Sequence, residues 1–459
     1  MGKPVKVAFV ALGCAKNLVD SEKMLGQLAE AGALITADES DADVIVINTC
    51  GFLEAARAEA LEAITEAVKR KRKGPCRRVV VAGCLVQRDG ERLLDAVPGI
   101  DALVGVHRRD DVVTAALKAV PRRKSRTTPR PAVDLYLGDY YPYVAVDTAR
   151  LRITPRHYAY LRISEGCNQQ CTFCTIPAIR GPMHCKPVEV VLAEARELIS
   201  DGAVEINLIG QDTTSYGQDL GYQPGLAGLL REVDRLDGAQ WIRLLYAYPS
   251  VFTDEMIDAL ADCPRIVKYV DLPLQHINDR VLRAMGRRVT RRRTEDLLDR
   301  LRKRIPGVVI RTTLIAGFPG ETPAEFEELL TFVREAGFAA MGVFPYSLEP
   351  DTPAGRMSGQ LPAKERQARA DALMEAQQEV AFAEAQRQIG RQFEVLIEHQ
   401  AGRGHFVGRH AGQAPEVDAV THVLADGLQP GRFVTVRCEK AQAYDLIGRP
   451  MQAILPVRQ

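Results

Sequence analysis

Short apolar runs of strand length alternate with helical patterns along most of this chain, and the alternation forms two separate series. The first series occupies residues 1 to about 120. Its apolar runs lie at 5–12, 44–48 and 79–82, and the helical patterns that follow them lie at 21–31, 53–71 and 90–96. Buried parallel strands joined by crossover helices produce this alternation. We therefore predict an α/β domain with a parallel sheet over residues 1–120.

The second series begins at Tyr158. Six apolar runs, each followed by helical spacing, lie at 158–163, 204–209, 241–248, 267–274, 308–316 and 341–346. Six strand-helix units predict a partial, TIM-like (β/α)6 barrel over residues 151–390, with reacting groups at the carboxyl ends of its strands. A long helical pattern from Lys364 to Arg387 is expected to close this domain.

Two further segments flank the second series. Residues 121–150 are predicted to be an interdomain linker, because the stretch from Lys118 to Val133 combines three prolines with six Lys or Arg side chains. After Gly390 the pattern changes to short alternating strands, at 393–397, 406–408, 420–424, 433–438 and 444–447. These strands predict a small, OB-like all-β barrel over residues 391–459.

The composition describes a soluble globular protein with several cores. A chain of 459 residues is too long for one core, and its formal net charge of +1 shows no overall bias toward nucleic acid or anionic membranes. The amino-terminal residues lack a signal-peptide pattern, and no run reaches the roughly 18 apolar residues of a membrane span. We expect a cytoplasmic protein without a membrane partner, whose ten cysteines are not disulfide-bonded.

Cys167, Cys171 and Cys174 directly follow the first strand of the second series, which places them at the predicted barrel mouth. Three thiolates on one tight loop can hold three irons of a four-iron cluster and leave the fourth iron open to a substrate or cofactor. Gly166 allows close backbone approach, and Phe173 can shield the cluster and pack on an aromatic cofactor.

A zinc site is the alternative for this loop, with His184 or Cys185 as the fourth ligand. The spacing Cys-x3-Cys-x2-Cys differs from the paired Cys-x2-Cys knuckles of zinc sites, which favours the cluster. If the loop bound zinc, the protein would be a non-catalytic, zinc-stabilised RNA-binding module.

The arrangement Cys-x3-Cys-x-aromatic-Cys after the first strand of a barrel resembles the radical S-adenosylmethionine superfamily. The resemblance implies S-adenosylmethionine as a cofactor that chelates the open iron and yields a 5′-deoxyadenosyl radical on one-electron reduction. By the same resemblance, Phe173 and Gln211 are candidate cofactor contacts, although Gln211 could equally be a polar turn residue. Arg311, on the fifth strand of the series, could pair with a cofactor or substrate carboxylate or form an ion pair inside the barrel.

A second set of cysteines occupies matching places in the first series. Cys14, Cys50 and Cys84 each stand at the carboxyl end of an apolar strand, and the carboxyl ends of parallel strands meet at one edge of a sheet. We therefore predict a second three-cysteine cluster, with three unrelated buried cysteines as the alternative. Asn17 and Asn48 could donate hydrogen bonds to it or be turn residues. The other cysteines are assigned to structure: Cys76, Cys185, Cys263 and Cys438.

Two three-cysteine sets, a barrel and a terminal β-barrel together resemble the methylthiotransferase family over essentially the whole chain. This resemblance implies two [4Fe-4S] clusters, S-adenosylmethionine, an electron donor such as flavodoxin or ferredoxin, and a terminal TRAM domain. In that family one cluster makes the radical and the second holds or donates the sulfur, which is methylated and transferred to the substrate carbon as a methylthio group.

The family has two main branches. The segments 208–217, 246–249 and 414–418 resemble the branch that modifies the β-carbon of an aspartate on small-subunit ribosomal protein S-twelve, free or within the subunit. The alternative branch modifies a tRNA adenosine next to the anticodon. From Arg391 onward there are eight Lys or Arg against seven Asp or Glu, whereas a domain that grips tRNA should be strongly positive. The ribosomal protein is the predicted substrate, and direct nucleic-acid contact is secondary.

The second series has two further features that are interpreted as mainly structural and one pair of residues that is a weaker functional candidate. The basic run at 287–293 is expected to be a solvated face, with contact to ribosomal RNA as the alternative. The segment 317–322 lacks the lysine of a P-loop, so no nucleotide site is assigned to it. Gln275 and His276 are weaker candidates to line the pocket.

Overall fold

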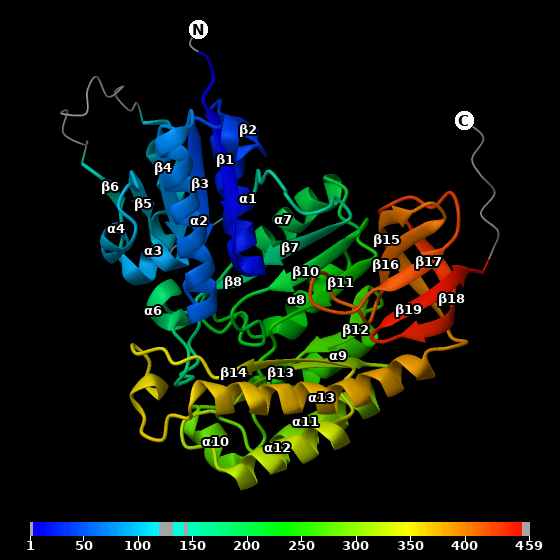
Figure 1. Cartoon of the computed structure of the whole chain (residues 1–459). Coiled ribbons are helices and arrows are strands. Elements are labelled where there is room, and N and C mark those ends of the chain that lie inside the picture. Colours follow the sequence, from blue (N-terminus) through cyan, green and yellow to red (C-terminus); the bar gives the residue numbers. More distant parts are fainter. Residues whose placement is uncertain (1–2, 119–131, 142–145, 452–459) are drawn as a thin grey trace. The chain divides into compact units, whose positions relative to one another are not determined.

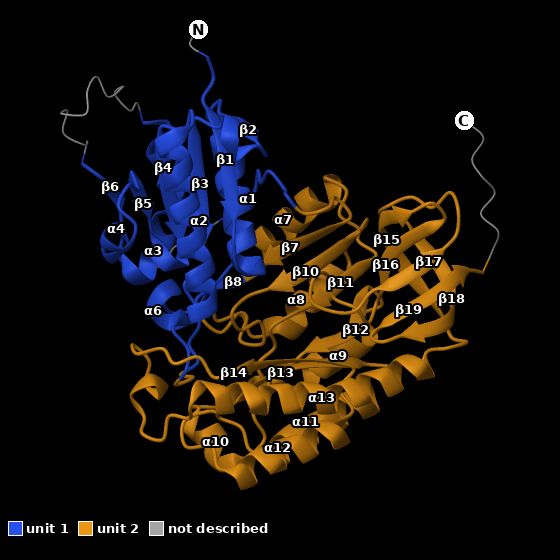
Figure 2. Cartoon of the chain, viewed as in Figure 1, with its two compact units in different colours: residues 1–153, 164–169, 173–186 blue, residues 154–163, 170–172, 187–459 orange. Residues whose placement is uncertain are grey.

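The computed structural model describes residues 3–118, 132–141 and 146–451 (Figure 1). The chain divides into two compact units, coloured blue and orange in Figure 2. Unit 1 comprises residues 1–153, 164–169 and 173–186, and unit 2 comprises residues 154–163, 170–172 and 187–459. Most of the proline-rich, basic part of the predicted linker lies outside the described residues. Within the described ranges, no helix combines the length and apolarity needed to cross a membrane.

Unit 1 is built on a six-stranded parallel sheet in the order β2-β1-β3-β4-β5-β6. Its strands are β1 (Lys6–Ala11), β2 (Leu34–Thr36), β3 (Val44–Thr49), β4 (Arg78–Gly83), β5 (Ala102–Val104) and β6 (Asp134–Tyr136). Its main helices are α1 (Ala15–Glu30), α2 (Glu54–Lys73), α3 (Cys84–Asp89), α4 (Arg92–Ala96) and α5 (Val112–Leu117). The predicted parallel α/β fold is confirmed. Strand β6 falls within the stretch expected to be a linker.

Helices cover both faces of this sheet. In β3, Ile45 and Ile47 pack in the same apolar cluster as Ile64 of α2, whereas Val46 packs in a second cluster with Met24 of α1. Every residue of β3 and β4 is buried. A strand that is buried on both faces reads as a continuous apolar run, which is why these strands could be located from the sequence.

Unit 2 contains the second parallel sheet, in the order β7-β10-β11-β12-β13-β14. Its strands are β7 (Tyr158–Arg162), β10 (Glu205–Ile209), β11 (Trp241–Leu244), β12 (Ile266–Asp271), β13 (Val309–Ala316) and β14 (Ala340–Pro345). Its helices include α7 (Val188–Ser200), α8 (Gly225–Asp234), α9 (Asp254–Asp262), α10 (Asp279–Ala284), α11 (Arg291–Arg304), α12 (Pro323–Ala336) and α13 (Ala363–Arg387). All six predicted strands and the long closing helix are present.

The carboxyl-terminal part of unit 2 is a closed five-stranded barrel in the order β15-β16-β17-β19-β18. Its strands are β15 (Gln392–Gly402), β16 (His405–His410), β17 (Thr421–Leu424), β18 (Phe433–Gln442) and β19 (Asp445–Pro450). Val395, Phe406, Val423 and Val436 form its core. The predicted all-β barrel is confirmed, and Phe406 is a core residue.

One segment of this small barrel, residues 411–418, contacts polar side chains on strands of the larger sheet. We call it the plug loop. Its Glu416 carboxylate accepts hydrogen bonds from the hydroxyls of Tyr158 and Tyr160 on β7, at 2.9 and 3.2 Å. Its Asp418 accepts one from Tyr269 on β12 at 2.7 Å and pairs with Arg311 on β13 at 3.3 Å.

A buried ion-pair cluster beside the plug loop joins two further strands to the small barrel. Arg409 of β16 contacts Glu205 of β10 at 2.6 Å and Glu398 of β15 at 2.7 Å. Arg243 of β11 contacts Glu205 at 2.9 Å and donates to the Ala411 carbonyl at 2.8 Å. Side chains from β7, β10, β11, β12 and β13 thus contact residues 409–418. Because five strands meet one short stretch of chain, the sheet must curve around it, as a partial barrel does.

Replacing Arg409 with methionine should lower the free energy of unfolding of unit 2 by about 3–5 kcal/mol, because it removes a buried guanidinium that pairs with both Glu205 and Glu398. Arg409 is 1% exposed, and burial of Glu205 is balanced by Arg409 and Arg243, which hold the pKa of that carboxyl below its usual range. Urea denaturation of the full chain measures the loss.

Arg449→Met is the matched control, because Arg449 pairs with Glu439 at 3.2 Å on the exposed surface of the same small barrel. A surface pair of this kind contributes less than about 1 kcal/mol. Equal denaturation midpoints for the two variants would show that the buried cluster does not stabilise unit 2.

Candidate active site

The loop that carries Cys167, Cys171 and Cys174 leaves the carboxyl end of β7 through the short strand β8 (Ser164–Glu165), which pairs with β9 (His184–Cys185). All three cysteines are partly accessible. The loop turns at Gly166, whose φ is +75°, and a Cβ there would lie 2.2 Å from the Pro182 carbonyl oxygen. This position therefore requires glycine.

Backbone amides point at two of these sulfurs. The Gln169 N–H donates to the Cys167 sulfur and the Ile176 N–H donates to the Cys174 sulfur, both at 3.4 Å. Hydrogen bonds to sulfur stabilise thiolates and are one of the means by which proteins tune iron–sulfur centres.

Cys171, which belongs to unit 2, lies beside a cation. Its sulfur is 3.7 Å from an Arg287 guanidinium nitrogen and 3.9 Å from the Tyr248 hydroxyl. The guanidinium stacks on the Tyr248 ring, with 4.1 Å to the ring centroid, and also donates to the Pro273 carbonyl. Arg287 is 7% exposed, so the expectation of a solvated face was wrong for this residue. Its positive charge instead stands next to a candidate thiolate ligand.

Cys14, Cys50 and Cys84 are brought together at one edge of the sheet in unit 1. Cys14 precedes α1, Cys50 follows β3, and Cys84 begins α3 directly after β4. The residues that precede Cys50 and Cys84 are paired in the sheet register. A Cβ on Gly13, whose φ is +96°, would lie 2.8 Å from the Cys50 Cβ, so the Cys14 and Cys50 loops are also in close approach.

The three thiols of this set differ in how readily they ionise. Burial raises the pKa of Cys84 to about 12, although Arg180 acts in the opposite direction. Burial also raises the pKa of Cys50. Cys14 is the most exposed residue of the three. Desolvation of its sulfur acts to raise the pKa, but the positive charges of Lys16 and Arg180 outweigh this effect, so the pKa of Cys14 is below its ordinary value. Iron binding would have to displace protons chiefly from Cys50 and Cys84.

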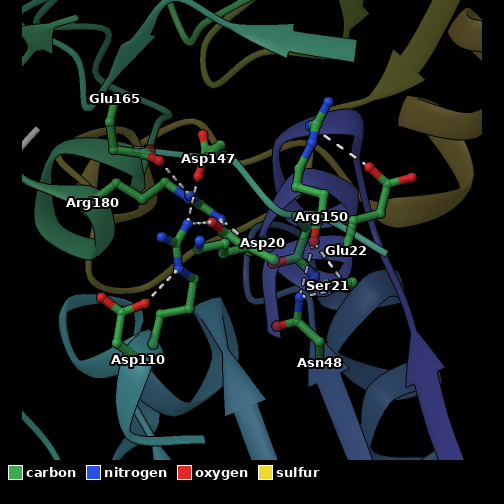
Figure 3. Close-up of polar contacts among 12 residues, drawn as sticks. Asp20, Ser21, Glu22, Asn48, Asp110, Asp147, Arg150, Glu165 and Arg180 are labelled. Carbon is green, nitrogen blue, oxygen red and sulfur yellow. Dashed lines mark hydrogen bonds and ion pairs between the residues drawn. The ribbon is translucent and has the colours of Figure 1, made fainter. Parts of the chain in front are cut away.

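A buried polar network, part of which is drawn in Figure 3, contacts this set through Arg180. Arg180 ends the short helix α6 (Ile176–Arg180), and its guanidinium contacts the Asp20 carboxylate at 3.0 Å, Glu165 at 2.9 Å and the Cys84 sulfur at 3.2 Å. Arg109 contacts Asp20 and Asp147, each at 3.0 Å. The network thus holds the Arg180 guanidinium beside the Cys84 sulfur.

The two asparagines near this set mainly organise the backbone. The Asn48 side-chain nitrogen donates to the Asn17 carbonyl at 2.9 Å and to the Ser21 hydroxyl at 2.8 Å, which uses both of its hydrogens. The expectation that Asn48 donates to a cluster was therefore wrong. Asn17 donates to the Leu12 carbonyl.

The other candidate residues lie in different environments. Phe173 is half-buried in the cysteine loop, and Gln211 is half-buried just beyond the end of β10. The Arg311 guanidinium contacts Asp271 at 3.1 Å and Asp418 at 3.3 Å. Of its two predicted roles, the structure therefore shows the ion pair.

The segment 317–322 has no free backbone donors at its turn for a phosphate to use. The N–H groups of Gly317 and Phe318 donate to the Glu321 carboxylate, at 2.9 and 3.2 Å. His276 is fully buried, with its Nε2 atom 3.6 Å from the same carboxylate. The segment 317–322 is therefore structural, as the missing P-loop lysine indicated. His276, a weaker pocket candidate, is instead buried against Glu321.

The four cysteines assigned to structure are all buried, and none of them forms a disulfide. In the part of the chain that the structure describes, no group of three or more His, Cys, Asp or Glu side chains is placed to hold a single metal ion. A four-iron cluster makes a different demand, because each cysteine binds a separate iron.

Comparison with known proteins divides the chain into three matched regions. Residues 6–105 match the model described as uncharacterized protein family UPF0004, residues 161–333 match the radical SAM superfamily, and residues 389–451 match the TRAM domain. Among solved structures, the chain resembles the radical S-adenosylmethionine methyltransferase TsrM from Kitasatospora setae, with a TM-score of 0.52, 17% identity and coverage of 77% of this chain and 74% of that one. At this identity the likeness concerns the fold alone.

The curated relatives extend over nearly the whole chain. The chain is 47% identical to the ribosomal protein uS12 methylthiotransferase RimO of Anaeromyxobacter sp. (strain K), with 97% of this chain and 93% of the relative covered. It is 45% identical to the protein of the same name from Symbiobacterium thermophilum, over 99% of this chain and 92% of the relative. Fold and sequence thus define a radical SAM methylthiotransferase. The chain belongs to the RimO family.

Proposed function

We propose that this enzyme transfers a methylthio group to the β-carbon of an aspartate on ribosomal protein uS12, with S-adenosylmethionine and two [4Fe-4S] clusters as cofactors. The observation that carries the proposal is the convergence of Cys14, Cys50 and Cys84 at one sheet edge, in addition to the superfamily's cysteine loop. Curated relatives at 40–47% identity carry the name ribosomal protein uS12 methylthiotransferase RimO, which supports this substrate and disfavours tRNA.

The donor sets fit the two clusters. Cys167, Cys171 and Cys174 would hold one cluster, and the strand-end cysteines would hold the other, each with one iron left open. When bound, the clusters supply one-electron and sulfur-transfer chemistry. The Arg287 guanidinium would offset the negative charge at Cys171. We propose Phe173 and Gln211 as contacts of S-adenosylmethionine.

Arg311 is assigned differently. Because its guanidinium is bound by Asp271 and Asp418, we propose that it joins the plug loop to the sheet rather than contacting the cofactor. The remaining parts of the proposal are a functional division into residues 1–120, 151–390 and 391–459, a cytoplasmic location, and flavodoxin or ferredoxin as the electron donor.

The mass of uS12 tests this function. In cells that lack the gene, we expect uS12 without its methylthio group, and restoration of the group when the gene is supplied again. Methylthioadenosine in tRNA from the same cells should be unchanged. If uS12 kept its mass while tRNA lost the modification, the enzyme would belong functionally to the tRNA branch.

A further inference from the structure

Arg180 is one of the largest side chains that are fully buried in the described chain, with 1% of its surface exposed. It lies six residues after Cys174, at the end of α6. A buried guanidinium is costly unless its charge and its N–H groups find partners. The identity of those partners therefore shows what this part of the fold is built around.

The partners of Arg180 come from both cysteine loops within unit 1. On one side, a guanidinium nitrogen contacts Glu165, two residues before Cys167, at 2.9 Å. On the other side, the second terminal nitrogen contacts Asp20 of α1 at 3.0 Å and the Cys84 sulfur at 3.2 Å. In Figure 3 the side chains of Arg180, Glu165 and Asp20 point toward one another.

The contact with sulfur goes beyond what charge balance requires. Arg180 pairs with Glu165 and shares Asp20 with Arg109, whose other buried partner is Asp147. The carboxylates of these ion pairs are therefore sufficient to balance the charge of Arg180 without a thiolate. The additional N–H directed at Cys84 points to a sulfur that carries negative charge in the working enzyme. A cationic donor in a dry interior acts strongly on such a sulfur, and hydrogen bonds to sulfur together with local net charge set the reduction potential of an iron–sulfur cluster.

We propose that Arg180 is a positioning residue that raises the reduction potential of the cluster on Cys14, Cys50 and Cys84 and ties its loops to the Cys167 loop. The inference rests on the proposed second cluster and concerns how that cluster is tuned. The guanidinium stabilises the reduced, more negative state more than the oxidised state, because its charge and its N–H both favour added negative charge.

The experiment uses the full chain with Cys167, Cys171 and Cys174 replaced by alanine, so that only the strand-end set can hold iron. Redox titration followed by electron paramagnetic resonance measures the midpoint potential, and iron analysis measures occupancy. In this background we expect Arg180→Gln to make reduction at least tenfold less favourable, which is about 59 mV for one electron. Arg180→Lys, which keeps the charge but loses the planar fork, should shift the potential less in the same direction.

Arg109→Gln is the matched control. Arg109 is also buried and shares Asp20 with Arg180, but its second ion-pair partner is Asp147 rather than a cysteine loop. We expect this variant to lose stability without a comparable shift in potential. A shift as large as that of Arg180→Gln would show that general disruption of the network, not the contact with sulfur, sets the potential.

An iron-loaded Arg180→Gln variant with the parent's potential would overturn the inference. If the Arg180→Gln variant does not hold iron, the Arg180→Lys variant is measured instead. A midpoint potential below that of the parent supports the proposed role of Arg180, and a midpoint potential equal to that of the parent refutes it. A parent without iron would refute the second cluster itself and this inference with it. That outcome is recognised before any arginine is changed.

Discussion

Replacing Cys167, Cys171 and Cys174 together with alanine will abolish the formation of 5′-deoxyadenosine from S-adenosylmethionine. Alanine cannot ligate iron, and without the cluster the cofactor has neither an iron to chelate nor a source of the electron that cleaves it. The expected loss is complete, to the level of a reaction without enzyme. Chromatographic quantification of 5′-deoxyadenosine under anaerobic conditions, with a chemical reductant, measures it.

Cys263→Ala provides the control for this prediction. Cys263 is 7% exposed at the end of α9 in unit 2 and is assigned to structure. The control variant should form 5′-deoxyadenosine at a rate close to that of the unchanged enzyme. Continued formation by the triple variant would remove the cysteine loop from the chemistry.

Replacing Cys14, Cys50 and Cys84 together should separate the two halves of the reaction. We expect this variant to keep forming 5′-deoxyadenosine, because the loop at Cys167 is unchanged, and to lose methylthio transfer to uS12 completely. The physical reason is that, in the proposed mechanism, the strand-end set would hold the sulfur to be transferred. Mass analysis of uS12 after incubation, alongside 5′-deoxyadenosine quantification, tests both parts.

Cys76→Ala is the matched control for the second set. Cys76 is 4% exposed in the core of unit 1, so its replacement perturbs the same unit without touching the strand-end cysteines. Methylthio transfer should survive in this variant. If the triple variant also transferred the methylthio group, the strand-end cysteines would be structural, as their alternative interpretation holds.

The fold could be predicted where buried apolar runs mark it. The strands that are buried along their whole length were located for this reason, namely β3 and β4 in the first sheet and β7, β10 and β11 in the second. The start of α1 was missed: the helix begins at Ala15, not Ser21, because its first turns carry Lys16, Asn17 and Asp20, which are polar yet buried. Strands β2, β5 and β6 were missed because each has only three residues, and β2 and β6 also lie at the sheet edges. Tertiary contacts, which periodicity does not record, decide both cases.

The candidate site also has some features that the sequence predicts and others that only the structure reveals. The convergence of the strand-end cysteines follows from the topology of a parallel sheet, so their spacing sufficed to predict it. Arg180 could not be found this way, since Asp20 lies 160 residues away in sequence and Cys84 lies 96 away. Arg287 was hidden in a basic run that resembles a solvated face. For Arg311, the partner that decides between its two interpretations is Asp418, in the plug loop 107 residues further on.

Iron and sulfide content of the anaerobically purified chain tests the two-cluster account most directly. The account predicts about eight irons and about eight sulfides per chain, falling to about four of each when Cys14, Cys50 and Cys84 are replaced, and likewise when Cys167, Cys171 and Cys174 are replaced. About four irons in the unchanged protein, with no further loss when the strand-end cysteines are removed, would contradict it.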